Sequence, residues 1–130
     1  EKVIKEELTS NVLKELANIE DFNDEMLESV FLSITKFHMS LSGRCQRSYD
    51  DMSVNIEALI KKELEDIFFQ SLLKKYQDES NEKLRMIATM LSWMIYGASI
   101  DWKQNSSKSP EDYFEYASLS IRQLLENGIV

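Results

Sequence analysis

The chain has 130 residues, 43% of them hydrophobic, which is enough apolar material for one domain with a buried core. Fifteen basic against 23 acidic residues give a net charge of −8, so the segment as a whole does not neutralise phosphates and is not expected to bind DNA alone. A single cysteine, Cys45, excludes an internal disulfide, and with only one histidine the usual zinc ligand sets are excluded too. We therefore expect no metal and no cofactor.

Hydropathy gives no sign of a targeting or membrane segment. The opening residues Glu1 to Ile4 lack the basic and apolar regions of a signal peptide, and we expect the first helix to continue upstream. The longest uncharged stretch, residues 86–100, is shorter than the ~20 residues that cross a bilayer. These features predict a cytoplasmic protein without a membrane partner.

One proline, three glycines and no alternating strand pattern predict an all-α fold, a bundle of five to six helices in a single domain over residues 1–130. The first helix is expected over residues 2–19. The second follows Asp21 or Asn23, either of which can cap it, and ends near Gly43. For residues 44–51, a short helix and an irregular link both remain open.

The second half of the chain predicts three more helices. An apolar stripe without glycine or proline indicates a long helix over residues 52–76. The next helix, residues 81–103, is apolar on nearly every side and so should be covered on both sides. After a polar linker, Ser109 as N-cap and Pro110 at the first helical position start the last helix, which should stop at Gly128.

Residues 90–113 carry a family resemblance. The segment Leu-Ser-Trp-Met-Ile-Tyr-Gly-Ala-Ser-Ile-Asp-Trp (91–102), then a linker and Ser-Pro-Glu-Asp-Tyr (109–113), resembles the last two helices of TetR/AcrR transcriptional regulators. The resemblance implies an N-terminal helix-turn-helix domain, expected upstream and absent from this chain, through which DNA would be bound. It also implies a homodimer in which the last two helices of each subunit form a four-helix interface.

The helix over residues 81–103 has two apolar faces, one for the core and one for a partner. One face holds Ile87, Leu91, Met94, Ala98 and Trp102, and which of the two points outward stays open. Gly97 in mid-helix destabilises the helix by roughly 1 kcal/mol relative to alanine. This cost is tolerated more readily where another helix must approach the backbone closely. The predicted dimer residues are Met90, Trp93, Gly97, Ile100, Phe114, Ala117, Ile121 and Leu125.

The middle helices offer candidates for an effector pocket, which the resemblance places there. Ligand pockets are mainly apolar with few polar groups, and methionines make them adaptable. The candidates are Phe37, His38, Leu41, Tyr49, Met52, Ile56, Ile60, Phe68, Leu91 and Met94. The alternative for each is an ordinary core residue, including His38, the only histidine. The effector is expected to be an apolar or amphipathic small molecule of unknown identity.

No catalytic set is recognisable. A di-iron bundle needs Glu-x-x-His, but Thr35 stands three residues before His38, and neither a nucleophile elbow nor a glycine-rich phosphate loop occurs. We therefore expect no enzyme. The sequence favours the regulatory domain of a bacterial repressor that senses an effector and controls DNA binding by a separate helix-turn-helix. The alternative is a helical dimerisation or protein-interaction module without a small-molecule ligand.

Overall fold

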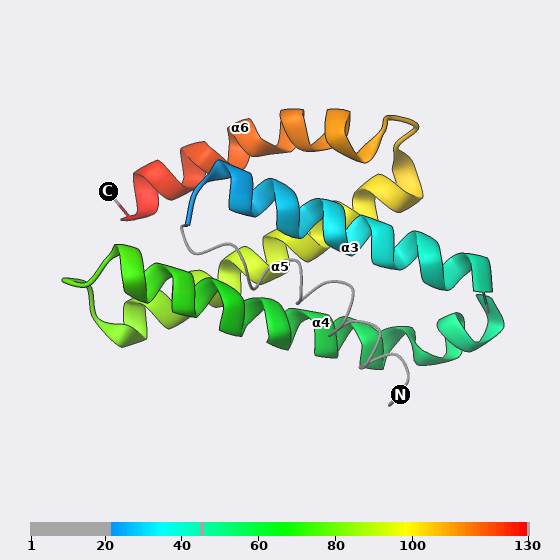
Figure 1. Cartoon of the computed structure of the whole chain (residues 1–130), viewed down its shortest axis with the longest axis horizontal. Coiled ribbons are helices and arrows are strands. Elements are labelled where there is room, and N and C mark those ends of the chain that lie inside the picture. The colour runs from blue at the N-terminus through cyan, green and yellow to red at the C-terminus, as the bar shows by residue number, and fades with distance from the viewer. Residues whose placement is uncertain (1–21, 45, 130) are drawn as a thin grey trace.

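The computed structural model describes residues 22–44 and 46–129, and the side-chain burial of residues 22–39 and 57–126. This part of the chain is entirely helical, which confirms the predicted all-α class (Figure 1). The first predicted helix, residues 2–19, lies outside the described residues. The four helices are α3 (Asp24–Arg44), α4 (Gln46–Lys75), α5 (Asn81–Asn105) and α6 (Pro110–Ile129).

Side-chain caps fix where three of the helices begin. The first N–H groups of a helix have no partner within it, and a short polar side chain before the helix accepts from one of them. Asn23 Oδ1 accepts from the backbone N–H of Met26 at 2.9 Å at the start of α3. Ser109 Oγ accepts from Asp112 N–H at 3.1 Å at the start of α6. Both caps were predicted, whereas the third, Ser80 before α5, was not.

The helix ends differ in part from the prediction. Residues 46–51 are the first turns of α4, so the open choice for residues 44–51 resolves to helix on either side of position 45. The predicted stop at Gly128 is wrong, because α6 continues to Ile129. A glycine ends a helix by adopting a left-handed conformation, and no described glycine has a positive φ.

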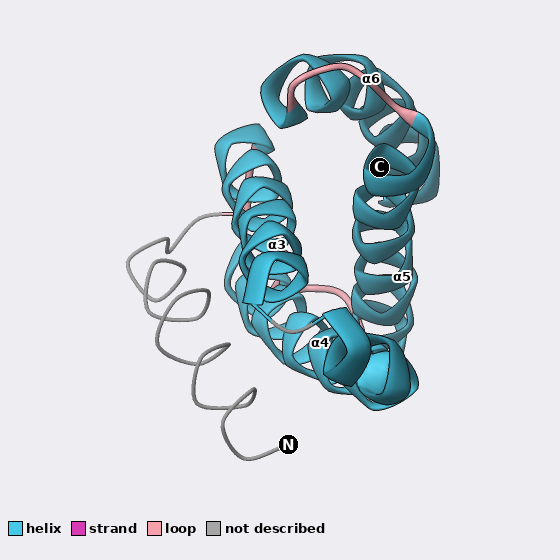
Figure 2. Ribbon diagram, turned by 90° about the vertical axis from the view of Figure 1, so that its right-hand side faces the viewer, coloured by secondary structure: helices cyan, strands magenta, loops and turns pink. Residues whose placement is uncertain are grey.

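The bundle places α3 and α5 between α4 and α6 (Figures 1 and 2). Both central helices pack against each other and against the two outer ones. Phe31 of α3 holds α6 in place, because its ring stacks on Tyr113 at 5.6 Å and lies 5.3 Å from the ring of Phe114. The core comprises Phe22, Met26, Leu27, Val30, Phe31, Ile34, Phe37, Ile60, Leu64, Phe68, Leu72, Leu84, Ile87, Ala88, Leu91, Ile95, Tyr96, Phe114 and Ile121.

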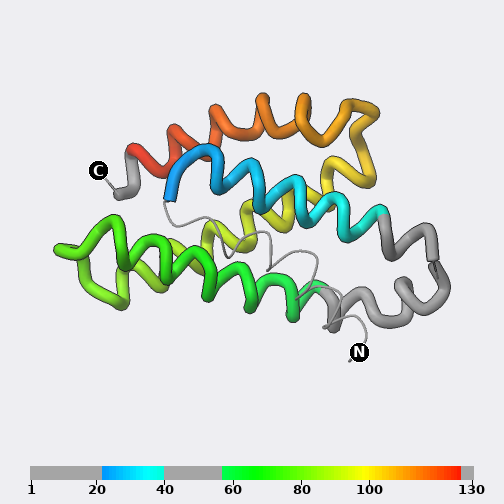
Figure 3. The backbone as a smooth tube through the Cα atoms, viewed as in Figure 1, coloured from blue at the N-terminus to red at the C-terminus, as the bar shows by residue number. Residues whose placement is uncertain are grey.

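Polar contacts tie three helices together at one end of the bundle, where α3 starts and α6 finishes (Figure 3). Lys75 Nζ in the last turn of α4 donates to the carbonyl oxygen of Phe22 at 2.9 Å. Arg122 of α6 pairs with Asp24 of α3 at 2.7 Å, although both side chains are well exposed. Exposed pairs stabilise little, so this one fixes orientation more than it adds stability. None of the described helices has the length and apolar character needed to cross a membrane.

The Ser109 cap can be tested by substitution. Ser109→Ala leaves the Asp112 N–H without its acceptor and should lower the free energy of unfolding by about 1 kcal/mol. Urea unfolding followed by circular dichroism measures the change. Ser107→Ala, in the same linker, is the control and should leave the midpoint unchanged. Equal effects of the two substitutions would contradict the cap.

Candidate functional site: the outer face of α5 and α6

One side of α5 faces the core and the opposite side is uncovered by the described chain. Leu84, Ile87, Ala88, Leu91, Ile95 and Tyr96 are buried on the inner side. Met86, Met90 and Trp93 are more than half exposed, and Gly97 lies with them on the outer side. The choice that the sequence left open is thereby resolved, because Met90, Trp93 and Gly97 point away from the core. The described residues cover α5 on one side only, so the covering of its second side stays a prediction.

Exposed large apolar side chains are concentrated on two helices. Among the residues whose burial is described, seven are of this kind, and six of them belong to α5 and α6: Met86, Met90, Trp93, Tyr116, Leu119 and Leu124. The seventh is Met39 of α3. Single exposed apolar residues are normal on a soluble protein, but several on adjacent helices form the kind of surface that binds a partner. We call these six residues the outer face.

A shallow groove joins the two helices within the outer face. Met86, Met90 and Met94 line it from α5, and Leu124 and Leu125 line it from α6. Its volume is about 130 Å³, and its lining is mainly apolar. Met86 and Met90 of α5 therefore meet Leu124 of α6 in this groove, which Lys83 also lines.

The predicted α6 interface needs correction. Phe114 and Ile121 are each only 4% exposed and belong to the core of their own chain. Ala117 and Leu125 are partly buried, as is Ile100 of α5. The predicted residues follow helical spacing, and that spacing identified the side of α6 that packs on α3.

Gly97 lies in open space on the outer face. A Cβ atom built at this position has no other atom of the described part of the chain within 4 Å, apart from the neighbouring helix backbone. Packing within the single chain therefore does not require glycine here. The close approach of a second helix stays a prediction.

The predicted effector residues do not gather around a described hollow. Phe37, His38, Ile60, Phe68 and Leu91 are all buried core residues, and Met94 is partly buried. Leu91 and Met94 line the groove between α5 and α6, on the outer side of the bundle. Leu41, Tyr49, Met52 and Ile56 lie outside the residues whose side chains are described.

His38 sits in an aromatic environment in the core. The centre of its ring lies 5.6 Å from that of Tyr96 and 6.3 Å from that of Phe37. Burial, helped by the positive charge of Lys103, lowers the pKa of His38 from 6.5 to about 4. The imidazole is therefore neutral at pH 7 and fills the core without carrying charge.

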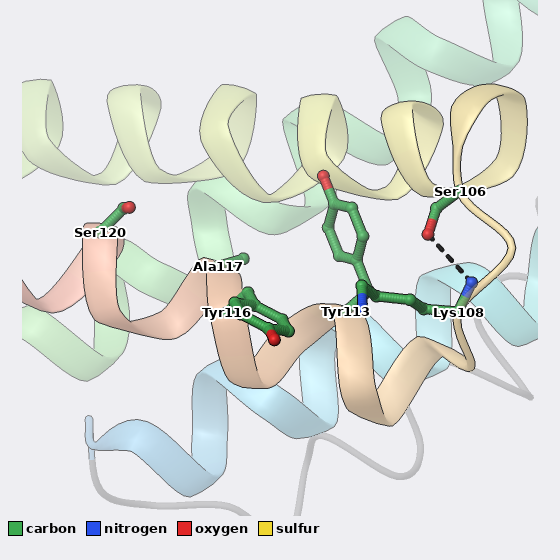
Figure 4. A pocket seen from close by; sticks show the side chains of 6 residues that line it. All are labelled: Ser106, Lys108, Tyr113, Tyr116, Ala117 and Ser120. Atoms are coloured by element: carbon green, nitrogen blue, oxygen red, sulfur yellow. Dashed lines mark hydrogen bonds between the residues drawn. The ribbon is translucent and has the colours of Figure 1, made fainter.

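A second hollow, which the sequence did not predict, lies where α5 passes into α6 (Figure 4). Its volume is about 350 Å³, and it is open to solvent. The lining residues are Ser106, Lys108, Tyr113, Tyr116, Ala117 and Ser120. They come from the linker and from the first three turns of α6, so only the polar linker followed by two tyrosines could have indicated it.

Hydrogen bonds hold the walls of this hollow. The Tyr113 hydroxyl donates to Asp101 Oδ2 at 2.7 Å, and Trp102 Nε1 donates to the carbonyl oxygen of Lys108 at 2.8 Å. The bonds from Tyr113 and Asn105 lower the pKa of Asp101. Partial burial, with the bond to Asp101, raises the pKa of Tyr113 to about 12. Tyr113 therefore stays protonated and bonded to α5 at neutral pH.

Searches of protein-family models, of curated proteins and of solved structures found no match to this chain. Within the described residues, no three side chains of histidine, cysteine, aspartate or glutamate are grouped as a metal site would require. The outer face, the groove within it and the hollow beside Lys108 are candidate sites among the described residues.

The burial of His38 predicts a loss of stability in acid. Unfolded histidine titrates near pH 6.5 but the folded residue near 4, so the unfolded chain takes up the proton first. The contribution of neutral His38 to the free energy of unfolding is complete above pH 6.5, and it is lost as the pH falls towards 4. A shift of this size corresponds to about 3 kcal/mol in the free energy of unfolding.

Urea unfolding at pH 7, 6, 5 and 4 measures this effect when the wild type is compared with His38→Leu. The variant keeps every carboxylate, so the difference between the two curves isolates His38. The free energy of unfolding of the wild type should fall more steeply below pH 6.5. If the free energies of unfolding of the two proteins changed in parallel with pH, the pKa of His38 would not be lowered in the folded state.

Proposed function

We propose that this chain is the dimerisation and effector-binding domain of a TetR/AcrR-type transcriptional regulator, with two copies joined through their outer faces. The observation that carries the proposal is the concentration of exposed apolar side chains on α5 and α6. These are the two helices for which residues 90–113 resemble the dimer helices of that family.

The composition of the outer face supports a protein partner. Methionine and aromatic residues are enriched in interface cores, and the outer face has Met86, Met90, Trp93 and Tyr116. Along α5 the outward residues follow the spacing i, i+4, i+7, i+11 from Met86 to Gly97, which forms one continuous seam. A seam of this kind pairs with its own copy about a two-fold axis, because the same surface then serves both subunits.

Effector sensing and control of DNA binding are the parts of the proposal that rest on the resemblance. An effector that prefers one arrangement of the helices shifts the population towards it. The segment before α3 would connect the bundle to the helix-turn-helix heads, which must reach major grooves about 34 Å apart. A small change in the bundle would then alter the spacing of the heads.

A second candidate function is a dimerisation module without a small-molecule ligand. It is favoured by the burial of Phe37, His38, Ile60 and Phe68, which are four of the six described candidates for the pocket. In this case every aromatic residue among them stabilises the core. The two candidates share the dimer and differ in the ligand.

The dimer can be tested at Gly97. Gly97→Arg places a charged side chain at the middle of the seam, so we expect a monomer in sedimentation velocity with unchanged helical circular dichroism. Gln70→Arg, on an exposed position of α4, adds the same side chain away from the outer face and should remain dimeric. A dimeric Gly97→Arg protein would exclude this interface.

Ligand binding can be tested by thermal shift with lipophilic cations, fatty acids and aromatic compounds. A ligand at a hundred times its Kd stabilises the folded state by about 2.7 kcal/mol, which raises Tm by several degrees. The sensing proposal predicts such a rise for at least one class. Uniform failure would leave the dimerisation module as the function.

A further inference from the structure

The hollow between the end of α5 and the start of α6 has the chemistry of a small anion site. Its lining contains the Lys108 ammonium, the Ser106 and Ser120 hydroxyls and the Tyr116 ring, and no carboxylate (Figure 4). It lies apart from the core residues that were considered for the effector. An inference about it therefore does not require an effector in the core, although Tyr116 belongs both to this hollow and to the outer face.

Lys108 is available to pair with an anion. Its ammonium lies 4.8 Å from the centre of the Tyr116 ring, and it forms no salt bridge with any of the described residues. Its side chain extends along the start of α6 towards that ring (Figure 4). The positive charge of the hollow is thus not neutralised by the described part of the chain.

The acid that accepts from Tyr113 already has two donors. Asp101 accepts from Tyr113 through Oδ2 and from Asn105 through Oδ1 at 2.9 Å. Both of its carboxylate oxygens therefore have donors on the α5 side of Tyr113. Ser106 Oγ accepts from the backbone N–H of Lys108 at 3.1 Å, which still leaves the Ser106 hydroxyl hydrogen able to donate to a ligand.

The walls are formed before any ligand arrives. Tyr113 is held by its stacking on Phe31 and by its bond to Asp101, and the backbone of Lys108 is held by Trp102. A site whose walls are fixed loses less conformational entropy on binding. The volume of about 350 Å³ lies in the range of small-molecule sites.

We propose that this hollow binds a small aromatic carboxylate. The carboxylate pairs with Lys108 and accepts from the Ser106 or Ser120 hydroxyl, while the ring of the ligand packs against Tyr116, which is 67% exposed. A single ammonium matches one negative charge, so a monocarboxylate is favoured over a phosphate dianion. The exposed tyrosine ring favours an aromatic acid over an aliphatic one.

The test is calorimetric titration of the whole chain with 1-naphthoate. Saturable binding with one site per chain is expected for the wild type, and Lys108→Met should weaken it at least tenfold. Lys62→Met, on an exposed position of α4, removes the same charge elsewhere and should bind like the wild type. The neutral 1-naphthamide should bind at least tenfold more weakly than the acid.

Several results would overturn the site. These are no saturable binding of 1-naphthoate at millimolar concentration, equal affinity of Lys108→Met and wild type, or an equal loss in Lys62→Met. Gly97→Arg separates this inference from the dimer, because a site within one chain keeps its affinity in a monomer. Loss of binding in that variant would mean that the site needs a second copy, which overturns the proposal as stated.

Discussion

The packing of α5 governs the rest of the structure. This helix is apolar on two faces, and α3, α4 and α6 cover only one of them. The inner face supplies Leu84, Leu91 and Ile95 to the core, so the helix is fixed in rotation. That rotation directs Met90 and Trp93 outward, so both side chains stay more than half exposed although Lys61 of α4 lies 4.5 Å from the centre of the Trp93 ring. The chain thus has more apolar surface on α5 than its own described part can bury, and this excess is the basis of the proposed dimer.

Tyr113 connects the hollow at the start of α6 to the core. Tyr113 stacks on Phe31 of α3 with one side of its ring, and its hydroxyl bonds to Asp101 of α5. One side chain of α6 therefore contacts both central helices. A movement of α3 relative to α5 would have to break one of these two contacts or move Tyr113 with it. Tyr113 also forms a wall of the hollow beside Lys108. The core and the hollow therefore share the side chain of Tyr113.

Much of the fold could be predicted from the sequence, because helical spacing and caps are local. The stripes gave α3, α5 and α6 to within a few residues, and Ser109 capped as expected. The site was harder, since spacing shows that an apolar stripe exists but not which neighbour covers it. In α6 the stripe that contains Phe114 and Ile121 faces the core of the chain. The exposed residues Tyr116 and Leu124 were not among the predicted dimer residues. The hollow at Lys108 forms where the linker folds back into α6, and in the sequence only the polar linker followed by two tyrosines could have indicated it.

Sedimentation equilibrium of the unmodified chain shows whether a second copy covers the outer face of α5 and α6. The chain has a mass of 15.2 kDa. The account predicts a particle of twice that mass at micromolar concentration, with the apparent mass falling towards that of one chain on dilution. A mass of 15.2 kDa at every concentration up to the highest soluble one would contradict it.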